Sequence, residues 1–419
     1  MEKLTLKNGL TVALDQRPDA HSAAISIHVA AGNRFETAPI SGISHFIEHM
    51  VFKGTESRSA EDIARESDIM GGQLNAFTAK EHTCFYSRAL TEHVPRTLHL
   101  MCDMLCNPLF DDHDIETEKG VVLEEIGMYE DSPEDLCSDL LNATCYKDKP
   151  LGFNILGTRD TVKSFTADVL RDYMSRAYAP ERIVVALCGN FDREVVLELL
   201  DSYFGSKRTM CNPVRYDTMS IDGGISIKHR DSEQTQLAFC FNGLPYGHEL
   251  RYASSFFSSI LGGASSSKIN QRIREELGLA YSTYSFTSNY LGTGMFGVSA
   301  GLAPKNQEKF FKEVADILRK TRDEITQEEI EMTREQFKAG LVLSNESMAA
   351  IASSAGRQLL LNGRYTDLSE ILSLIGRVTI DQVKESARLV TDYSTIALSA
   401  VGDVSSENFY REMLENLKW

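Results

Sequence analysis

The stretch Gly42-Ile43-Ser44-His45-Phe46-Ile47-Glu48-His49-Met50 contains the pattern His-x-x-Glu-His at residues 45–49. On a helix, His45 and His49 are one turn apart, so both imidazoles and the carboxylate of Glu48 project from one face. Two neutral imidazoles beside a carboxylate suit a zinc ion and a base for its bound water. The same spacing also arises by chance, so the metal interpretation requires a third ligand elsewhere in the chain.

A second motif supplies that ligand. The run Glu118-Lys119-Gly120-Val121-Val122-Leu123-Glu124-Glu125 lies in a helix predicted to begin near Asp111-Asp112. Glu118 and Glu125 are seven residues apart and share one face of that helix, whereas Glu124 points away from it. The alternative is an ordinary solvated acidic face. The apolar residues of this helix argue against a solvated face; they are Val121, Val122, Leu123 and Ile126. A carboxylate on a largely apolar helix needs a partner such as a metal.

With these motifs the chain resembles the insulinase/pitrilysin (inverzincin) metallopeptidases. The match is closest to two-lobed bacterial members that are similar to the mitochondrial processing peptidase β subunit. In that family a glutamate follows the second histidine by about 76 residues, which is the separation of Glu125 from His49 here. The resemblance implies that His45, His49 and Glu125 bind one Zn²⁺ per chain and that Glu48 is the general base. It implies that Glu118 orients a ligand.

Two further stretches match the family. The segment 71–78 looks like its substrate-binding edge strand, which implies that Asn75, Ala76, Phe77 and Thr78 pair with the peptide backbone. The Gly71-Gly72 pair also fits the end of a helix that starts after Ser59, and both interpretations can hold. The segment 265–282 resembles the second-lobe signature, which implies that Arg274 and Tyr281 complete the active site across a cleft. If the resemblance is set aside, it is equally plausible that Arg274 is an ordinary cation on a helix face and that Tyr281 is a core aromatic residue. The chain departs from the family at Asn270, where an aromatic residue is common.

Composition excludes several other functions. The net charge is −17, and Lys and Arg form no cluster and no stripe with aromatic residues, so nucleic acid and anionic membranes are poor partners. Acidic runs such as Pro133-Glu134-Asp135 either favour basic peptides or form a solvated face. No apolar run approaches the roughly 20 residues of a membrane span.

The start of the chain and its cysteines indicate a cytoplasmic protein. The first twelve residues lack the apolar segment of a signal peptide and predict a hairpin with a type I′ turn at Asn8-Gly9. The eight cysteines are scattered, as is typical of a reducing compartment.

A weak internal repeat predicts the architecture. The runs 182–192 and 394–404 each contain a buried strand followed by Gly and a polar residue, and a helix precedes each run. We therefore expect an α+β fold of two similar lobes, each a mostly antiparallel sheet packed with helices, forming a clamshell. The expected domains are a catalytic zinc-binding lobe (1–205), a linker (206–223) and a substrate-binding lobe (224–419).

The function that these features predict is hydrolysis of short or unfolded peptides by a zinc endopeptidase. The family implies a homodimer. One alternative is the catalytic subunit of a heterodimer with an inactive homologue, and a more distant one is a non-catalytic peptide-binding scaffold. Leader-peptide processing and general peptide degradation both fit these features.

Overall fold

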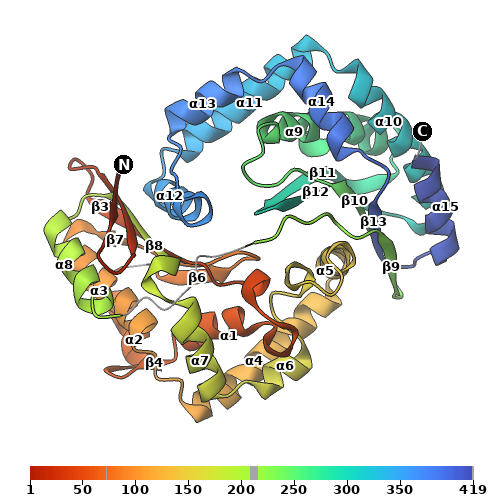
Figure 1. Cartoon of the computed structure of the whole chain (residues 1–419). Helices are drawn as coiled ribbons and strands as arrows, with labels where there is room; N and C mark the ends of the chain where they lie inside the picture. Colours follow the sequence, from red (N-terminus) through yellow and green to blue (C-terminus); the bar gives the residue numbers. More distant parts are fainter. Residues whose placement is uncertain (72, 208–215, 418–419) are drawn as a thin grey trace. The chain divides into compact units, whose positions relative to one another are not determined.

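The protein, described in a computed structural model over residues 1–71, 73–207 and 216–417, divides into two compact units. Each unit has its own sheet and its own core, which confirms the expected α+β class (Figure 1). The first unit comprises Met1–Ile126, Phe153–Arg215 and Val342–Asp367, and the second comprises Gly127–Gly152, Tyr216–Leu341 and Leu368–Trp419. Within the described ranges, no helix has the length and apolar character that crossing a membrane requires.

The first unit is built on a six-stranded sheet. Its strands are β1 (Glu2–Thr5), β2 (Thr11–Gln16), β3 (Ser22–Val29), β6 (Asn75–Thr78), β7 (Thr83–Leu90) and β8 (Ile183–Gly189). Their order is β1-β2-β8-β3-β7-β6, in which β2 and β8 run parallel and all other neighbours are antiparallel. A separate short ladder joins β4 (Gly54–Thr55) to β5 (Arg58–Ser59).

The second unit repeats this plan with five strands. They are β9 (Gly224–His229), β10 (Thr235–Asn242), β11 (Ala280–Tyr290), β12 (Thr293–Leu302) and β13 (Ile396–Gly402). Their order is β11-β12-β10-β13-β9, and β9 and β13 run parallel, as β2 and β8 do in the first sheet. The two orders are identical once β1 is set aside, which confirms the two lobes of similar plan that the repeat predicts.

Helices surround both sheets. Those of the N-terminal half are α1 (Ile43–Met50), α2 (Ala60–Ile69), α3 (Val94–Cys106), α4 (Asp112–Asp131), α5 (Pro133–Cys145), α6 (Arg159–Ser164), α7 (Ala167–Ala177) and α8 (Arg193–Phe204). Those of the C-terminal half are α9 (Arg251–Ser258), α10 (Gln307–Glu324), α11 (Gln327–Ser344), α12 (Met348–Asn362), α13 (Leu368–Gly376), α14 (Ile380–Val390) and α15 (Glu407–Leu417). Two short π-helical segments, Ser259–Gly263 and Asn270–Glu276, follow α9.

The two faces of the first sheet differ in side-chain size, because alternate residues of a strand point to opposite faces. Large residues such as Ile27 and Val185 share a core with α1, α3, α7 and α8. The other face carries small residues such as Ala24 and Ala186 and packs against α12. These small side chains allow α12 to approach the sheet closely. At Gly356 of α12, for example, a Cβ would lie 2.2 Å from Cδ2 of His28 on β3.

The second sheet is covered in the same manner. Its large-residue face includes Phe239 and Phe296 and packs with α9, α10 and α14. Its other face includes Ala238 and Ala397 and packs with Leu141 of α5. In Figure 1, α5 is drawn in the yellow of the N-terminal half while the strands it covers, β9, β10 and β13, are green to blue.

Each compact unit includes one helix from the other half of the chain, whereas the expected domains divide the chain at residues 205 and 224. The unit that contains the N-terminus includes α12 from the C-terminal half, and the other unit includes α5 from the N-terminal half. The physical reason is that each sheet needs a helix on its small-residue face. Of the expected linker 206–223, residues 208–215 lie outside the described part of the chain.

The N-terminal hairpin is present, but its predicted type I′ turn is wrong. A type I′ turn needs positive φ at both central residues, and Asn8 does not have one. Instead Gly9, at φ +91°, donates its N–H to the carbonyl of Leu6, and the N–H of Leu6 bonds the carbonyl of Leu10. The glycine therefore has left-handed backbone angles at the residue that follows the two central residues of the turn, and it is not itself one of the two.

Candidate metal centre

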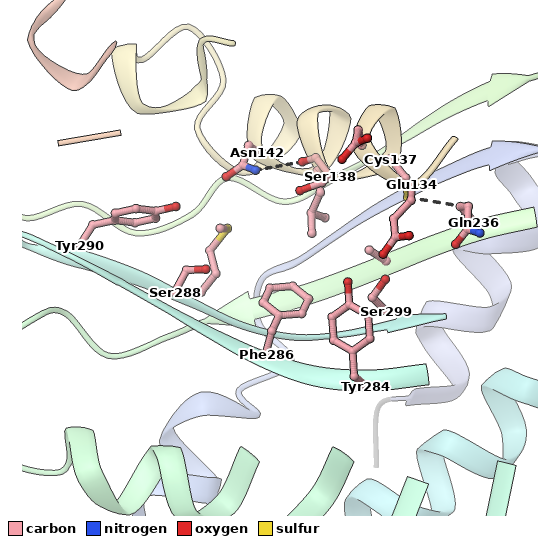
Figure 2. Close-up of a pocket in the computed structure, with 14 residues that line it drawn as sticks. Glu134, Cys137, Ser138, Asn142, Gln236, Tyr284, Phe286, Ser288, Tyr290 and Ser299 are labelled. Atoms are coloured by element: carbon pink, nitrogen blue, oxygen red, sulfur yellow. Dashed lines mark hydrogen bonds between the residues drawn. The ribbon is translucent and has the colours of Figure 1, made fainter. Parts of the chain in front are cut away.

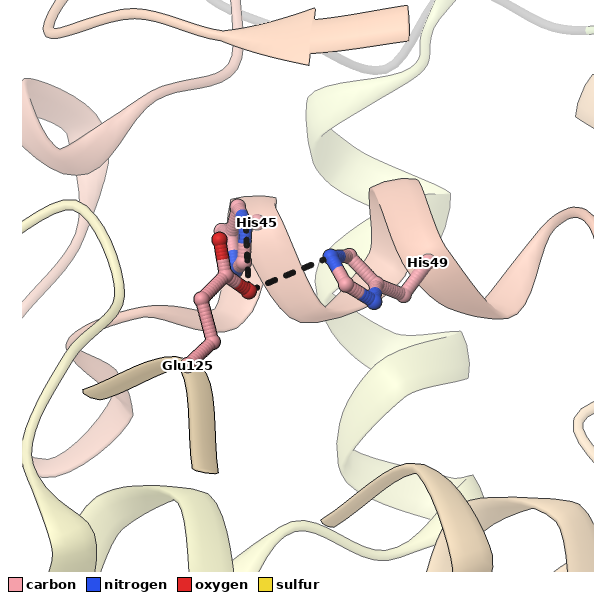
Figure 3. A group of neighbouring side chains, drawn as sticks. All are labelled: His45, His49 and Glu125. Atoms are coloured by element: carbon pink, nitrogen blue, oxygen red, sulfur yellow. Dashed lines mark ion pairs between the residues drawn. The ribbon is translucent and has the colours of Figure 1, made fainter. Parts of the chain in front are cut away.

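The helices α1 and α4 bring three candidate ligands together. Nε2 of His45 and Nε2 of His49 each lie 3.7 Å from Oε2 of Glu125. Figure 3 shows both imidazoles on one helix with the Glu125 carboxylate beside them. One ligand atom from each residue lies within 4.8 Å of the other two. These three are the residues predicted to bind zinc, and the structure places them side by side although 76 residues separate Glu125 from His49.

The start of α1 is held by a buried carboxylate. Glu36 accepts hydrogen bonds from the backbone N–H groups of Gly42 (2.7 Å) and Ser44 (2.9 Å), which a helix N-terminus leaves without intrahelical partners. The Ser44 hydroxyl lies 2.8 Å from the Tyr173 hydroxyl of α7. Gly42 has φ +90°, and a Cβ there would lie 2.6 Å from Cα of Gly157, so only glycine fits. These contacts fix the position of the helix that carries both histidines.

His49 is oriented by Glu118. Nδ1 of His49 lies 2.8 Å from Oε1 of Glu118, and Nζ of Lys53 lies 2.6 Å from the other carboxylate oxygen. Burial raises the pKa of Glu118, but the hydrogen bond with His49 and the ion pair with Lys53 outweigh burial and hold that pKa below its usual value. Glu118 is therefore an ionised acceptor that leaves Nε2 of His49 free for a metal.

His45 is held in a different way. Its ring is buried, its Nε2 faces Glu125, and its Nδ1 has no hydrogen-bond partner among the described residues. Burial, together with the neighbouring His49, lowers the pKa of His45 to about 3. The imidazole is thus neutral near pH 7, which is the form that binds metal.

The donor set fits zinc. Two imidazole nitrogens and one carboxylate oxygen are the three protein ligands of many catalytic zinc sites, which leave one position for water. Two ligands about 2.1 Å from a tetrahedral ion lie about 3.4 Å apart, close to the two spacings of 3.7 Å. Glu124, the competing carboxylate, is exposed and lies outside the cluster. Val121 is also exposed, contrary to the expectation that the apolar residues of this helix are covered.

Glu48, the predicted base, is half-buried on the same helix. Its Oε2 accepts a hydrogen bond of 2.5 Å from the Thr78 hydroxyl. Burial raises the pKa of Glu48, and the Thr78 hydrogen bond only partly offsets that effect. Glu48 therefore combines an elevated proton affinity with a fixed orientation, both of which suit a base.

The predicted substrate strand is β6, at the edge of the first sheet. It pairs with β7 on one side, with Ala76 opposite Phe85 and Thr78 opposite Thr83. Asn75 and Phe77 are exposed, whereas Ala76 and Thr78 are half-buried. The free side of an edge strand can accept an extended peptide. Gly72, in the glycine pair before this strand, lies outside the described residues.

Arg274 and Tyr281 belong to the second unit. Cζ of Arg274 lies 5.7 Å from the ring centroid of Tyr281, and the tyrosine is 78% exposed. Arg274 is exposed on a helical segment, as a helix-face cation would also be, whereas Tyr281 is not the core aromatic of the alternative interpretation. Asn270 donates a 2.6 Å hydrogen bond to the Ser265 carbonyl and so fixes the preceding loop.

The second unit also contains a cavity of about 360 Å³ beside α5. Figure 2 shows Tyr284 and Phe286 of β11 pointing from the sheet toward this helix. Glu134 and Asp135, from the first turn of α5, line the cavity and remain exposed. The two acidic side chains, Glu134 and Asp135, are thus both part of a cavity wall and in contact with solvent.

Sequence reasoning missed three contacts of the site. They are the cap that Glu36 provides, the ion pair of Lys53 with Glu118 and the hydrogen bond of Thr78 to Glu48. The orientation of the Thr78 side chain was predictable, because the alternation of β6 puts it on the same face of the strand as Ala76. Glu36 and Lys53 lie outside the helix, where periodicity gives no signal.

The comparisons with known proteins agree with this geometry. A family model described as Insulinase (Peptidase family M16) matches residues 11–159, and one described as Peptidase M16 inactive domain matches residues 164–337. The chain is similar to the uncharacterized zinc protease YmxG of Bacillus subtilis, with 37% identity over 97% of this chain and 100% of the relative. The uncharacterized zinc protease SCO5738 of Streptomyces coelicolor is 35% identical over 98% of this chain and 91% of the relative.

Solved structures share the fold. A protease from Helicobacter pylori superposes with a TM-score of 0.87 at 22% identity, covering 96% of this chain and 99% of the other. A peptidase M16 inactive domain protein from Pseudomonas fluorescens gives 0.89 at 18% identity, covering 97% and 98%. Given these similarities and the full-length match to a relative of 37% identity, the chain belongs to the insulinase family of peptidases, M16.

Proposed function

We propose that this protein is a zinc-dependent endopeptidase that hydrolyses short or unfolded peptides. The observation that carries the proposal is the cluster of His45, His49 and Glu125 with Glu48 beside it on α1. The names of the relatives, which are zinc proteases, support the same metal. We assign His45, His49 and Glu125 as ligands of one Zn²⁺ per chain and Glu118 as the residue that orients His49.

Each residue of the proposed site has its own role in the hydrolysis. A zinc ion, when bound, lowers the pKa of a water molecule to about 7 and polarises a carbonyl. Glu48 takes a proton from the attacking water and delivers it to the leaving amine. The free edge of β6, at Asn75 to Thr78, holds the peptide extended. We assign Arg274 and Tyr281 to the substrate, to stabilise negative charge that develops on it or to anchor it.

The proposed assembly is a homodimer in the cytoplasm. Support for a reducing compartment comes from the cysteines, since all seven in the described part of the chain are free. Gel filtration of the purified chain distinguishes a homodimer from the subunit of a heterodimer.

Digestion of a mixed pool of unstructured peptides tests the function, with wild type and Glu48→Gln compared by mass spectrometry. We expect cleavage by wild type alone, with equal zinc content in both proteins. Cleavage by Glu48→Gln would overturn the base assignment. An absence of cleavage by either protein would favour the heterodimer or the scaffold.

A further inference from the structure

The hydrogen bond from Thr78 to Glu48 joins the strand β6 to the helix α1. Thr78 is the last residue of β6, and its side chain lies on the half-buried face of the strand together with Ala76. The strand β6 packs against α1, and the Thr78 hydroxyl reaches Glu48 of that helix. The Oγ1–Oε2 distance of 2.5 Å is at the short end for a hydroxyl that donates to a carboxylate, as expected for a charge-assisted bond.

The proton of the Thr78 hydroxyl has no rival acceptor of equal strength. Thr83 lies directly across the ladder, with its Oγ1 3.2 Å from that of Thr78. The Thr83 hydroxyl donates its own single proton to the Ala31 carbonyl at 3.0 Å. Each hydroxyl therefore has its own acceptor, and the carboxylate is the stronger of the two acceptors near Thr78.

This arrangement distinguishes the two oxygens of Glu48. Oε2 is held by Thr78, and no other hydrogen bond to this carboxylate is present in the described part of the chain. We infer that Thr78 is a positioning residue, whose hydroxyl holds Oε2 of Glu48 so that Oε1 takes the proton of the attacking water. The inference rests on the proposed function, because it assigns a role to Thr78 in the same hydrolysis.

The position of Thr78 also couples two parts of the site. Its backbone belongs to the edge strand that we propose to hold the peptide, and its side chain holds the base. A displacement of β6 therefore moves the peptide and the carboxylate together. Such coupling keeps the geometry between base and scissile bond constant.

The variants Thr78→Val and Thr78→Ser test the inference on the zinc-loaded protein. Valine keeps the β-branched shape and the backbone pairing but removes the hydroxyl, whereas serine keeps the hydroxyl. A hydrogen bond to a charged group corresponds to roughly a 10- to 100-fold effect on a rate. We expect Thr78→Val to lower kcat by about that factor with KM within about threefold, and Thr78→Ser to retain most of kcat.

Thr83→Val is the matched control, because it removes a neighbouring hydroxyl that does not touch Glu48. We expect a lower Tm, since the Ala31 carbonyl loses its partner, with kcat within about twofold of wild type. An equal loss of kcat in Thr83→Val and Thr78→Val would overturn the inference, as it would indicate a general packing effect. Loss of zinc from Thr78→Val would do so as well, because Thr78 touches no metal ligand.

Crystal structures of zinc-loaded wild type, Thr78→Val and Thr78→Ser decide the contact without any assay of turnover. We expect one orientation of the Glu48 carboxylate in wild type and Thr78→Ser and a rotated carboxylate in Thr78→Val. An unrotated carboxylate in Thr78→Val would overturn the inference even if wild type cleaves peptides. If wild type cleaves no peptide, the proposed function is wrong. The three structures still test, independently of cleavage, whether Thr78 sets the orientation of the Glu48 carboxylate.

Discussion

The carboxylate of Glu118 lies 2.8 Å from Nδ1 of His49 and thereby determines which nitrogen of that imidazole is available to a metal. Lys53 holds the second oxygen of the same carboxylate at 2.6 Å. The orientation of one proposed ligand thus depends on two residues that do not bind the metal.

Replacing Glu118 should weaken zinc binding. Loss of a residue that orients a metal ligand typically costs about 10- to 100-fold in affinity. We expect that loss for Glu118→Ala and a smaller one for Glu118→Gln, which keeps an acceptor for His49 but loses the charge. Competition with a chelator of known zinc affinity measures both. Glu124→Gln, on the same helix but outside the cluster, should bind zinc as wild type does, and a loss there would contradict the assignment of Glu125.

Replacing Arg274 should slow turnover without releasing the metal. Its guanidinium lies over the ring of Tyr281, and neither residue is part of the metal cluster in the first unit. In one of its two proposed roles Arg274 stabilises charge in the transition state, and removal of such a group costs about 100- to 1,000-fold in kcat. Peptide hydrolysis and zinc content of Arg274→Ala are measured on one preparation. Zinc loss in this variant would show that the role given to Arg274 is wrong.

Asp103 should make stability depend on pH. Its buried carboxylate accepts hydrogen bonds from Thr55 (2.7 Å), Arg58 (2.6 Å) and Asn107 (2.8 Å). Burial raises the pKa of Asp103, but these hydrogen bonds outweigh burial and hold the pKa below its ordinary value. The stabilisation is therefore complete above the unfolded pKa of about 3.9 and is lost as the pH falls through the lower folded value.

Asp103→Asn removes that contribution. We expect it to lower stability at pH 7 by roughly 1–3 kcal/mol, because hydrogen bonds to a buried charged group are lost. The difference from wild type should shrink as the pH falls below about 4. Thermal unfolding followed by circular dichroism between pH 3 and pH 7 measures it. The exposed Asp168→Asn should change stability by no more than about 0.5 kcal/mol, and a constant deficit of Asp103→Asn at all pH values would contradict the linkage.

The packing of α12 predicts opposite effects of two glycine-to-alanine substitutions. A Cβ at Gly356 would lie 2.2 Å from Cδ2 of the buried His28, so Gly356→Ala should destabilise by about 1–3 kcal/mol. Gly340 of α11 is exposed, and no atom beyond its chain neighbours and the backbone of its own helix lies within 4 Å of such a Cβ, so Gly340→Ala should stabilise by about 1 kcal/mol. The two Tm shifts should therefore differ in sign. Equal shifts would show that α12 does not approach β3 so closely.

Local sequence patterns predicted much of the fold and of the candidate site. The helix of the His-x-x-Glu-His motif, the second helix with Glu118 and Glu125 and the capping box of Ser59 with Asp62 all appear as predicted. Helix periodicity and capping depend on residues within a few positions of one another, so a single sequence contains the information. The repeated strand pattern likewise predicted two lobes of one plan.

Contacts between distant residues were not accessible in the same way. Helices α5 and α12 each present an apolar face, and nothing in that pattern states which sheet the face covers. The same holds for Thr78, since alternation gives the face of the strand but not the identity of Glu48 as the residue that it meets. The turn at Asn8-Gly9 differs from the predicted type because the dipeptide also suits a turn in which only the glycine has positive φ.

The exchange of α5 and α12 between the compact units has a consequence for fragments of this protein. A polypeptide ending at residue 205 would lack α12, and the alanine-rich face of its sheet would be open to water. A polypeptide starting at residue 224 would lack α5 and expose Cys240 and Met295. Neither half is therefore expected to be a self-sufficient folding module. Expressed separately, each should be insoluble, whereas expression of both in one cell should restore a complex by complementation.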